Sequence, residues 1–179
     1  MKTHKSGRLL AYTLIVTIPL WFGSCKKGTD VTPTSANIEG TWRTTGYRAD
    51  PGVDVGGGKK ETDLLVVYRT SLSAIFGAKF GDLFVGCITN TKVTFLSGGK
   101  VSSQSDPACA QLDGAAPVTN TSTWKLDGNK LTITDGPDVT TYDAAISGST
   151  LKLSAQEMID FDGDGKEEKY NTTLELTKQ

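Results

Sequence analysis

Polar and hydrophobic residues alternate along most of the second half of the chain. Beyond Thr91, short segments with an apolar residue at every second position are separated by turns built on Gly, Asn, Asp and Ser. Such alternation is typical of strands that bury one face. An earlier segment rich in Thr, Tyr and Trp has the same character. The pattern predicts strands at residues 38–49, 91–95, 100–103, 122–126, 130–134, 139–146, 150–155, 157–161 and 168–176.

Short turns join most of these predicted strands. Ser97-Gly98-Gly99 is one such hairpin turn. Short connections make strands that follow each other in sequence antiparallel neighbours in the sheet. A meander of this length must close or curl to remove its exposed edges. The sequence therefore predicts a mainly β fold, an antiparallel up-and-down meander that closes into a barrel of about eight strands.

The hydrophobic period changes between Lys60 and Phe84. Apolar residues recur there at three- and four-residue spacing, at Leu64, Leu65, Tyr68, Leu72, Ile75, Phe76 and Phe80. This spacing predicts one amphipathic helix after the first strand, at residues 60–84, with Gly77 as a candidate break. Such a stripe is far more often core than a ligand groove. The pattern leaves open whether the helix plugs the barrel or lies outside it.

The beginning of the chain carries a different pattern, an apolar run within Leu9 to Cys25. The run follows Lys2, Lys5 and Arg8, and it is too short for a membrane span but suits a secretory signal. Its end, Phe-Gly-Ser-Cys, resembles the signal of bacterial lipoproteins, in which the cysteine becomes the first mature residue and carries the acyl chains. The alternative is a plain signal peptide cut near Gly23, which would leave an odd number of cysteines.

The lipoprotein interpretation divides the chain into three parts. Residues 1–24 are expected to be the signal peptide, residues 25–37 the lipidated Cys25 with a flexible polar tether, and residues 38–179 the folded domain. We expect the protein to be held by its lipid in the outer membrane of the cell envelope. Whether it faces the periplasm or the cell surface stays open.

The amino-acid composition excludes several classes of function. The chain has 179 residues with 19 basic and 20 acidic side chains, and three of the basic ones lie in the predicted signal. No basic patch indicates nucleic acid as a partner. The single histidine, His4, also lies in the signal, so histidine-based catalysis and imidazole zinc sites are excluded for the mature protein. We therefore expect a protein that is not an enzyme.

Cys87 and Cys109 are the two cysteines that remain if Cys25 carries lipid. In an exported protein they are expected to form a disulfide, which by the chain-entropy argument stabilises the fold by about 3 kcal/mol. The functional alternative is a redox pair or a thiolate metal site. Their spacing is much longer than that of redox motifs, which favours a structural bridge.

A run of alternate carboxylates near the C-terminus is the one constellation with metal chemistry. Asp160, Asp162 and Asp164 take positions one, three and five of a calcium loop, a glycine follows at position six, and Glu168 takes position nine. Position twelve is Asn171 rather than the usual glutamate, and predicted strands flank the loop. The alternative is a hairpin turn in which Asp-Gly pairs supply the backbone geometry and the acidic side chains stay in water.

Several motifs together resemble a known family. Gly40-Thr41-Trp42 matches the G-x-W signature of lipocalins, and residues 87–109 resemble their order of cysteine, strand, glycine turn, strand and cysteine. The ladder at residues 124–133 and 146–153 is also typical. The chain from residue 38 to its end resembles lipocalin-like lipoproteins of the Bacteroidetes.

The resemblance implies a barrel that binds a small apolar molecule or a protein partner. It also implies that Trp42 caps the core, as Trp124 is expected to do. Where lipocalins place an arginine against this tryptophan, only Lys178 is available.

Three functions stay open at this point. The first is a lipid-anchored, non-catalytic protein that binds a small apolar molecule or a protein partner. The second is a structural or interaction module with a filled barrel and a calcium-stabilised hairpin. The third, ranked last, is a carboxylate enzyme such as a glycan hydrolase, which needs two facing acidic groups. A lined cavity of about 300 Å³ or more favours the first, and a filled interior favours the second.

Overall fold

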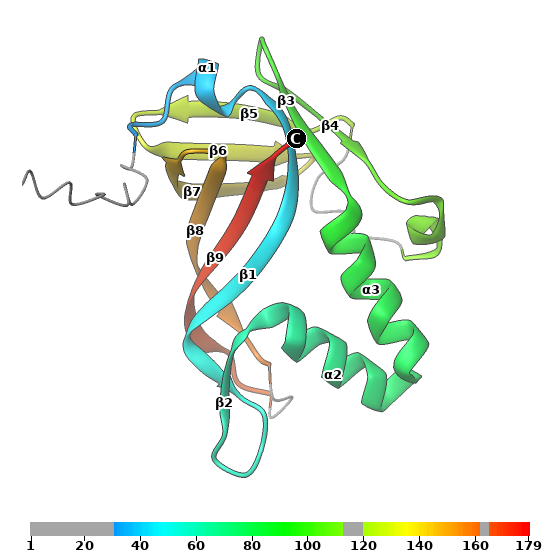
Figure 1. The fold of residues 1–179 in the computed structure, drawn as a ribbon. Helices are drawn as coiled ribbons and strands as arrows, with labels where there is room; N and C mark the ends of the chain where they lie inside the picture. The colour runs from blue at the N-terminus through cyan, green and yellow to red at the C-terminus, as the bar shows by residue number, and fades with distance from the viewer. Residues whose placement is uncertain (1–30, 113–119, 162–164) are drawn as a thin grey trace, which may run out of the picture.

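The computed structural model of the chain describes residues 31–112, 120–161 and 165–179 (Figure 1). Within these residues the helices are α1 (Ser35–Ile38), α2 (Leu64–Phe76) and α3 (Ala78–Asn90), with one 3₁₀ turn, η1 (Pro107–Gln111). The strands are β1 (Gly40–Asp54), β2 (Lys60–Asp63), β3 (Lys92–Leu96), β4 (Lys100–Gln104), β5 (Thr123–Asp127), β6 (Lys130–Asp135), β7 (Asp138–Ser147), β8 (Thr150–Ile159) and β9 (Glu168–Lys178).

Eight antiparallel strands close into a barrel, in the order β1-β3-β4-β5-β6-β7-β8-β9, with β9 pairing back onto β1. The ninth strand, β2, pairs with the far end of β1 only, outside the closed ring. Closure satisfies the backbone groups that an open meander would expose. The predicted mainly β barrel is therefore confirmed.

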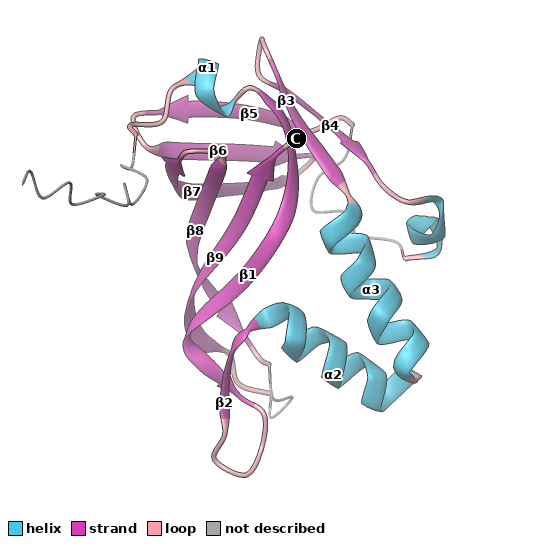
Figure 2. Ribbon diagram, viewed as in Figure 1, coloured by secondary structure: helices cyan, strands magenta, loops and turns pink. Residues whose placement is uncertain are grey.

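The barrel is uneven in depth. Strands β1, β8 and β9 are long and continue past the ring, and the helical hairpin of α2 and α3 lies beside their extension (Figures 1 and 2). The weakest seam is between β4 and β5, whose register is limited to Lys100 opposite Thr123. One end of the barrel is therefore closed and compact. The other end is bounded on one side by the extensions of β1, β8 and β9, which we call the wall.

A bulge in β1 decides which side chains face inward. The pairing of β1 with β9 shifts between Thr44 and Gly46, so Thr45 is the extra residue. Before the bulge Trp42 and Thr44 are buried, and after it Tyr47 and Ala49 take the inward positions. Without the extra residue, the two-residue period would direct Tyr47 to the outer surface.

Strand β8 corrects one prediction. The segments 150–155 and 157–161, predicted as separate strands, form one continuous strand from Thr150 to Ile159. Gln156 pairs with Asn171 of β9 in an unbroken register, so no turn separates the two halves. The connection expected around the Asp-Gly repeats falls between β8 and β9, and residues 162–164 of it lie outside the described residues.

The helical prediction is also corrected. Residues 60–84 do not form one helix: Lys60–Asp63 form β2, and two helices follow, separated at Gly77 with φ of 92°. A positive φ is strained for residues other than glycine and stops a helix. The two helices approach each other closely at Gly81, because glycine has no side chain. A Cβ at this position would overlap Ser73 Oγ of α2. Helix α3 also continues to Asn90, so Cys87 lies within it.

Two apolar clusters hold the fold together. The barrel core contains Ile38, Trp42, Val93, Phe95, Val101, Trp124, Leu131, Ala144, Ile146, Leu151, Leu153 and Leu176. The second cluster joins α2 to the extended wall through Ala49, Val53, Leu64, Val67 and Tyr170. Helices α2 and α3 therefore lie beside the wall beyond the ring and contribute no residue to the barrel core.

The described end of the predicted tether lies against the barrel. Val31 forms an isolated bridge with Ile146, and the short helix α1 follows with Thr34 as its capping residue. Ile38, the last residue of α1, is fully buried. The chain is thus attached to the closed end of the barrel from Val31 onward, before the point at which the sequence analysis placed the folded domain.

Candidate functional site

The closed end of the barrel is capped by Trp42. Its side chain is 1% exposed, and its Nε1 donates a hydrogen bond to the Ile38 carbonyl oxygen at 2.7 Å. Lys178 of β9 places its Nζ 5.2 Å from the centroid of the Trp42 ring. The predicted role of Lys178 is therefore confirmed. With the polar atom of Trp42 satisfied and the ring enclosed, this end is a structural plug.

An apolar cavity of about 40 Å³ lies further along the barrel interior. Six of its lining side chains are hydrocarbon or aromatic hydrocarbon, and two carry hydroxyls. The lining residues come from β1, β3, β6, β7, β8 and β9: Thr44, Val93, Phe95, Ile133, Tyr142, Leu153, Leu174 and Leu176. A few convergent hydroxyls in an apolar lining are characteristic of sites for small ligands.

Glu157 and three tyrosines gather beyond this cavity, and we call Tyr47, Tyr68, Tyr142 and Glu157 the mouth site. Glu157 is half-buried and pairs in register with the buried Tyr170, so it faces the inner side of β8. The Tyr47 hydroxyl donates to Glu157 Oε2 at 3.3 Å. The rings of Tyr47 and Tyr68 stack with centroids 6.3 Å apart. Side chains from β1, α2, β7 and β8 therefore converge on one carboxylate.

The mouth site lies where the two apolar clusters meet. Tyr142 packs against the barrel core, whereas Tyr47 and Tyr68 pack against the second cluster. Tyr68 also contacts Phe84 of α3 and Phe161, with ring centroids 5.6 and 6.0 Å away. The helical hairpin therefore supplies one side of the mouth, and the barrel supplies the other.

Burial and one negative charge set the electrostatics of this site. Desolvation, and then the charge of Glu157, raise the pKa of Tyr47, Tyr68 and Tyr142 above the usual value for tyrosine. The three phenols are therefore neutral at physiological pH and act as hydrogen-bond donors and apolar surface. Among the described residues, Glu157 is the one acidic side chain whose charge acts on all three tyrosines, so this site lacks the paired carboxylates of a glycan hydrolase.

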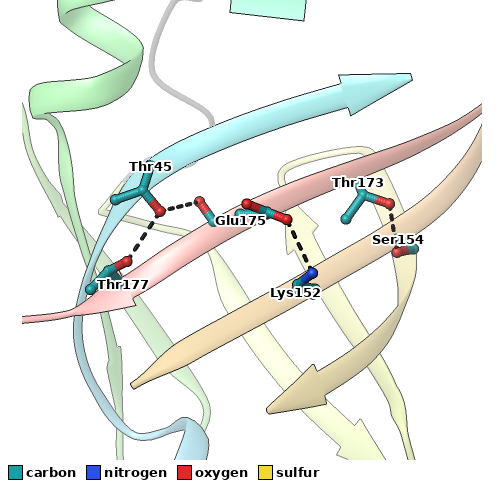
Figure 3. A network of polar contacts seen from close by, with 6 residues as sticks. All are labelled: Thr45, Lys152, Ser154, Thr173, Glu175 and Thr177. Carbon is teal, nitrogen blue, oxygen red and sulfur yellow. Dashed lines mark hydrogen bonds and ion pairs between the residues drawn. The ribbon is translucent and has the colours of Figure 1, made fainter. Parts of the chain in front are cut away.

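The outer face of the same wall carries a different kind of polar group. Lys152 Nζ lies 3.1 Å from Glu175 Oε1, and Ser154 and Thr173 share a hydrogen bond of 2.9 Å (Figure 3). Thr45 donates to the Glu175 carbonyl oxygen at 3.3 Å. Glu175 thus has a cation beside it, while Glu157 on the inner face has a phenol.

The predicted disulfide is present. Cys87 and Cys109 are bonded at an S–S distance of 2.06 Å, joining α3 to η1 across a separation of 22 residues. Both cysteines are buried. The bridge holds the end of α3 against the connection between β4 and β5, next to the weakest seam of the barrel, which is a structural role.

The predicted calcium residues are only partly within the described structure. Asp162 and Asp164 lie outside the described residues. Asp160 follows the end of β8 and accepts a hydrogen bond from the Gly165 backbone N–H at 2.9 Å, and Glu168 begins β9 opposite Ile159. Within the described residues no group of three metal-ligating side chains occurs. The calcium assignment therefore stays a prediction.

The predicted lipid site, Cys25, and the signal peptide at residues 1–24 also lie outside the described residues. Within the part of the chain that is described, no helix has the length and hydrophobicity needed to cross a membrane. Lipidation and the membrane as a partner stay predictions.

Sequence reasoning did not identify the mouth site. Glu157 occupies an inward position that continues the series Leu151, Leu153 and Ala155, and a charged residue in such a series indicates a site at the end of a barrel. The signal was hidden because the alternation was interpreted as ending at Ala155. The convergence of Tyr47 and Tyr68 on Glu157 could not be predicted, because it depends on the β1 bulge and on the position of α2.

Comparison with known proteins gives one finding about family. The family model described as a lipocalin-like domain matches residues 38–153, which include β1, both helices of the hairpin and the barrel strands as far as the middle of β8. No curated protein and no solved structure matches the chain significantly.

Proposed function

Because the chain belongs to the lipocalin-like domain family, we propose that it is a non-catalytic protein that binds a small apolar molecule at the open end of its barrel. The observation that carries this proposal is the apolar cavity in the barrel, because one of its lining residues, Tyr142, is also a member of the mouth site. Apolar lining supplies the binding free energy, and the few hydroxyl groups orient the ligand.

The size of the cavity limits how the ligand enters. A volume of about 40 Å³ holds a few water molecules, whereas typical ligand pockets measure about 300–1,000 Å³. We therefore expect the ligand to lie mainly at the mouth, between Tyr142 and Tyr68, with only a narrow apolar end inside the barrel. A bulky rigid ligand such as a haem does not fit this arrangement.

A chain that begins at Lys26 is suited to the test. Every contact described here lies at or beyond Val31, so this chain keeps them all and lacks the predicted lipid. The probe is N-phenyl-1-naphthylamine, a neutral dye whose fluorescence rises in apolar surroundings. We expect saturable binding that octanol reverses.

Two variants of β8 locate the binding. Ala155→Phe places a ring on the inner face of β8 between the cavity and Glu157, and Gln156→Phe places the same ring on the exposed outer face. We expect Ala155→Phe to weaken dye binding about tenfold or more, which corresponds to about 1.4 kcal/mol, and Gln156→Phe to leave it unchanged. Equal weakening in both variants, with unchanged melting temperatures, contradicts binding at the mouth.

We also propose that Cys25 carries lipid that holds the protein in the outer membrane of the cell envelope. The charged, apolar and small-residue zones of residues 1–25 support this. In cells supplied with labelled palmitate, the natural chain is expected to take up label and Cys25→Ser to take up none. Label retained by Cys25→Ser would contradict lipidation at this residue.

A filled structural barrel with a calcium-stabilised hairpin is the second candidate, and the small cavity volume favours it. Asp160 Oδ2 accepts a hydrogen bond from the Gly165 backbone N–H at 2.9 Å, which supports a role for this carboxylate in the loop. Calorimetric titration of calcium into the metal-stripped chain tests it, beside Asp162→Ala and Asp164→Ala. Saturable heat that both variants abolish supports a calcium site, whereas no heat at millimolar calcium reduces the loop to a turn.

A further inference from the structure

Glu157 carries a charge that the described structure leaves without a cation. The ion pairs of Arg69 with Asp82, Lys130 with Asp143 and Lys152 with Glu175 do not involve Glu157. Its described polar contact is the Tyr47 hydroxyl at 3.3 Å, which is a long hydrogen bond to Oε2 alone. Oε1 is therefore available to a further donor.

The surroundings of this carboxylate make a cation favourable there. Glu157 is half-buried between two apolar clusters, where water solvates a charge less well and a partner of opposite charge is worth more than at the surface. Tyr47, Tyr68 and Tyr142 add aromatic rings; Tyr47 and Tyr68 stack on each other through one face each, and a ring attracts a cation over its free face at centroid distances of up to about 6 Å. The site thus combines one fixed charge with several aromatic surfaces.

A neutral hydrogen-bond donor is a less suitable ligand for Glu157 than a cation is. A neutral ligand could donate to Glu157, but it would leave the negative charge uncompensated between the two clusters. An anionic ligand would be repelled by the same carboxylate. On the outer face of the wall, the corresponding carboxylate of Glu175 forms an ion pair with Lys152 (Figure 3). No described ion pair joins a lysine or an arginine to Glu157.

We propose that the mouth site binds the ammonium group of an amphiphilic amine, primary or quaternary, with Glu157 as its counter-ion and the apolar tail directed toward the cavity. This inference rests on the proposed function, because it names the ligand class for the same open end of the barrel. A primary ammonium would donate to Glu157 Oε1. A quaternary ammonium would lie against the tyrosine rings and be held by charge alone.

Four probes, each with a straight chain of eight carbon atoms and a different polar end, test the proposal: octylamine, octyltrimethylammonium, octanol and octanoate. Each is titrated by calorimetry into the chain that begins at Lys26, below the concentration at which the probe aggregates. We expect both cations to bind at least about tenfold more tightly than octanol, a factor that corresponds to about 1.4 kcal/mol, and octanoate to bind most weakly.

Matched variants assign the preference to Glu157. Glu157→Gln removes the inner charge, and Glu175→Gln makes the same change on the outer face of the same wall. Glu157→Gln is expected to bring both cations to the affinity of octanol and to leave octanol unchanged. Glu175→Gln is expected to keep the full preference. A preference that survives Glu157→Gln, or is lost equally in both variants, overturns the assignment.

The outcomes also separate this inference from the proposed function. If octanol binds as tightly as the cations to the natural sequence, the amine inference is wrong and apolar binding stands. If none of the four probes binds, the proposed function fails and the inference fails with it. The comparison of probes on the natural sequence remains decisive even if Glu157→Gln proves too unstable to study.

Discussion

The two ends of the barrel differ in how fully their polar atoms are hydrogen-bonded and enclosed. At the closed end, the single polar atom of Trp42 is satisfied by the Ile38 carbonyl and its ring is covered by Lys178. At the open end, Glu157 is half-buried near residues of both apolar clusters, and its Oε2 accepts one long hydrogen bond from the Tyr47 hydroxyl. A satisfied and enclosed group stabilises the fold, whereas a partly satisfied group is a place for a ligand.

The comparison predicts that truncation at the closed end has the largest effect on stability. Trp42→Ala removes a ring that is 1% exposed, and such changes typically cost about 3–5 kcal/mol in the free energy of unfolding. Tyr47→Phe at the mouth keeps the ring and loses a hydroxyl, with an expected cost below about 1.5 kcal/mol. Urea unfolding of both variants measures the difference. Similar losses would remove the distinction between the two ends.

The disulfide is expected to have the second largest effect. The pair Cys87→Ser and Cys109→Ser frees η1 from α3, and the loss of loop-closure constraint costs about 3 kcal/mol in the free energy of unfolding. Because α3 carries Phe84, which contacts Tyr68, dye binding at the mouth is expected to weaken as well. Circular dichroism and dye titration measure the two effects. Unchanged dye affinity would show that the mouth does not depend on the position of α3.

The barrel could be predicted from the sequence because its determinants are local. Alternation with a period of two, and turns such as Asp127-Gly128-Asn129, specify both the strands and their antiparallel order. The cysteine pair was predictable for a similar reason, since few pairings were available. The helical segment and its break at Gly77 were predictable from the sequence, but the packing of the two helices against each other was not, because it depends on the close contact at Gly81.

The mouth site could not be predicted because its residues are brought together by tertiary structure. Tyr47 faces inward only because of the bulge at Thr45, and Tyr68 reaches it because α2 packs against the extension of β1 and β9 through the second cluster. In the sequence, Glu157 looks like a strand end and Tyr142 looks like an ordinary barrel residue. Inward direction and proximity are properties of the closed fold.

Ionisation of the tyrosines at the mouth gives a pH-dependent test with a moderate effect. Their pKa values are raised in the folded state, above the value of about 10 that applies to unfolded chains. The stability that this difference contributes is fully present below pH ~10 and is lost as pH rises through the folded-state pKa values.

We therefore expect the urea midpoint to fall above pH ~10. Tyrosinate absorbance should rise late, together with unfolding. Glu157→Gln removes the second largest cause of the shift at Tyr47, so its absorbance change should begin at lower pH. The control is Glu175→Gln, which changes the outer face only. If all tyrosines of the folded natural protein titrate near pH 10, the mouth is more open to water than the structure indicates.

The contact between Lys178 and Trp42 is expected to have the smallest effect. The Lys178 side chain is exposed, and a cation over a ring at an exposed site contributes about 0.5–1 kcal/mol. Lys178→Met keeps the hydrocarbon stem and removes the charge, so it isolates this contribution in urea unfolding.

Lys178→Arg should keep or increase the stability, because a guanidinium stacks on an indole ring more readily than an ammonium does. A loss in Lys178→Arg equal to that in Lys178→Met would show that position 178 contributes through its bond from Nζ to the Asn37 carbonyl oxygen, at 3.3 Å, rather than through the ring. The closed end would then resemble the mouth in depending on hydrogen-bond geometry.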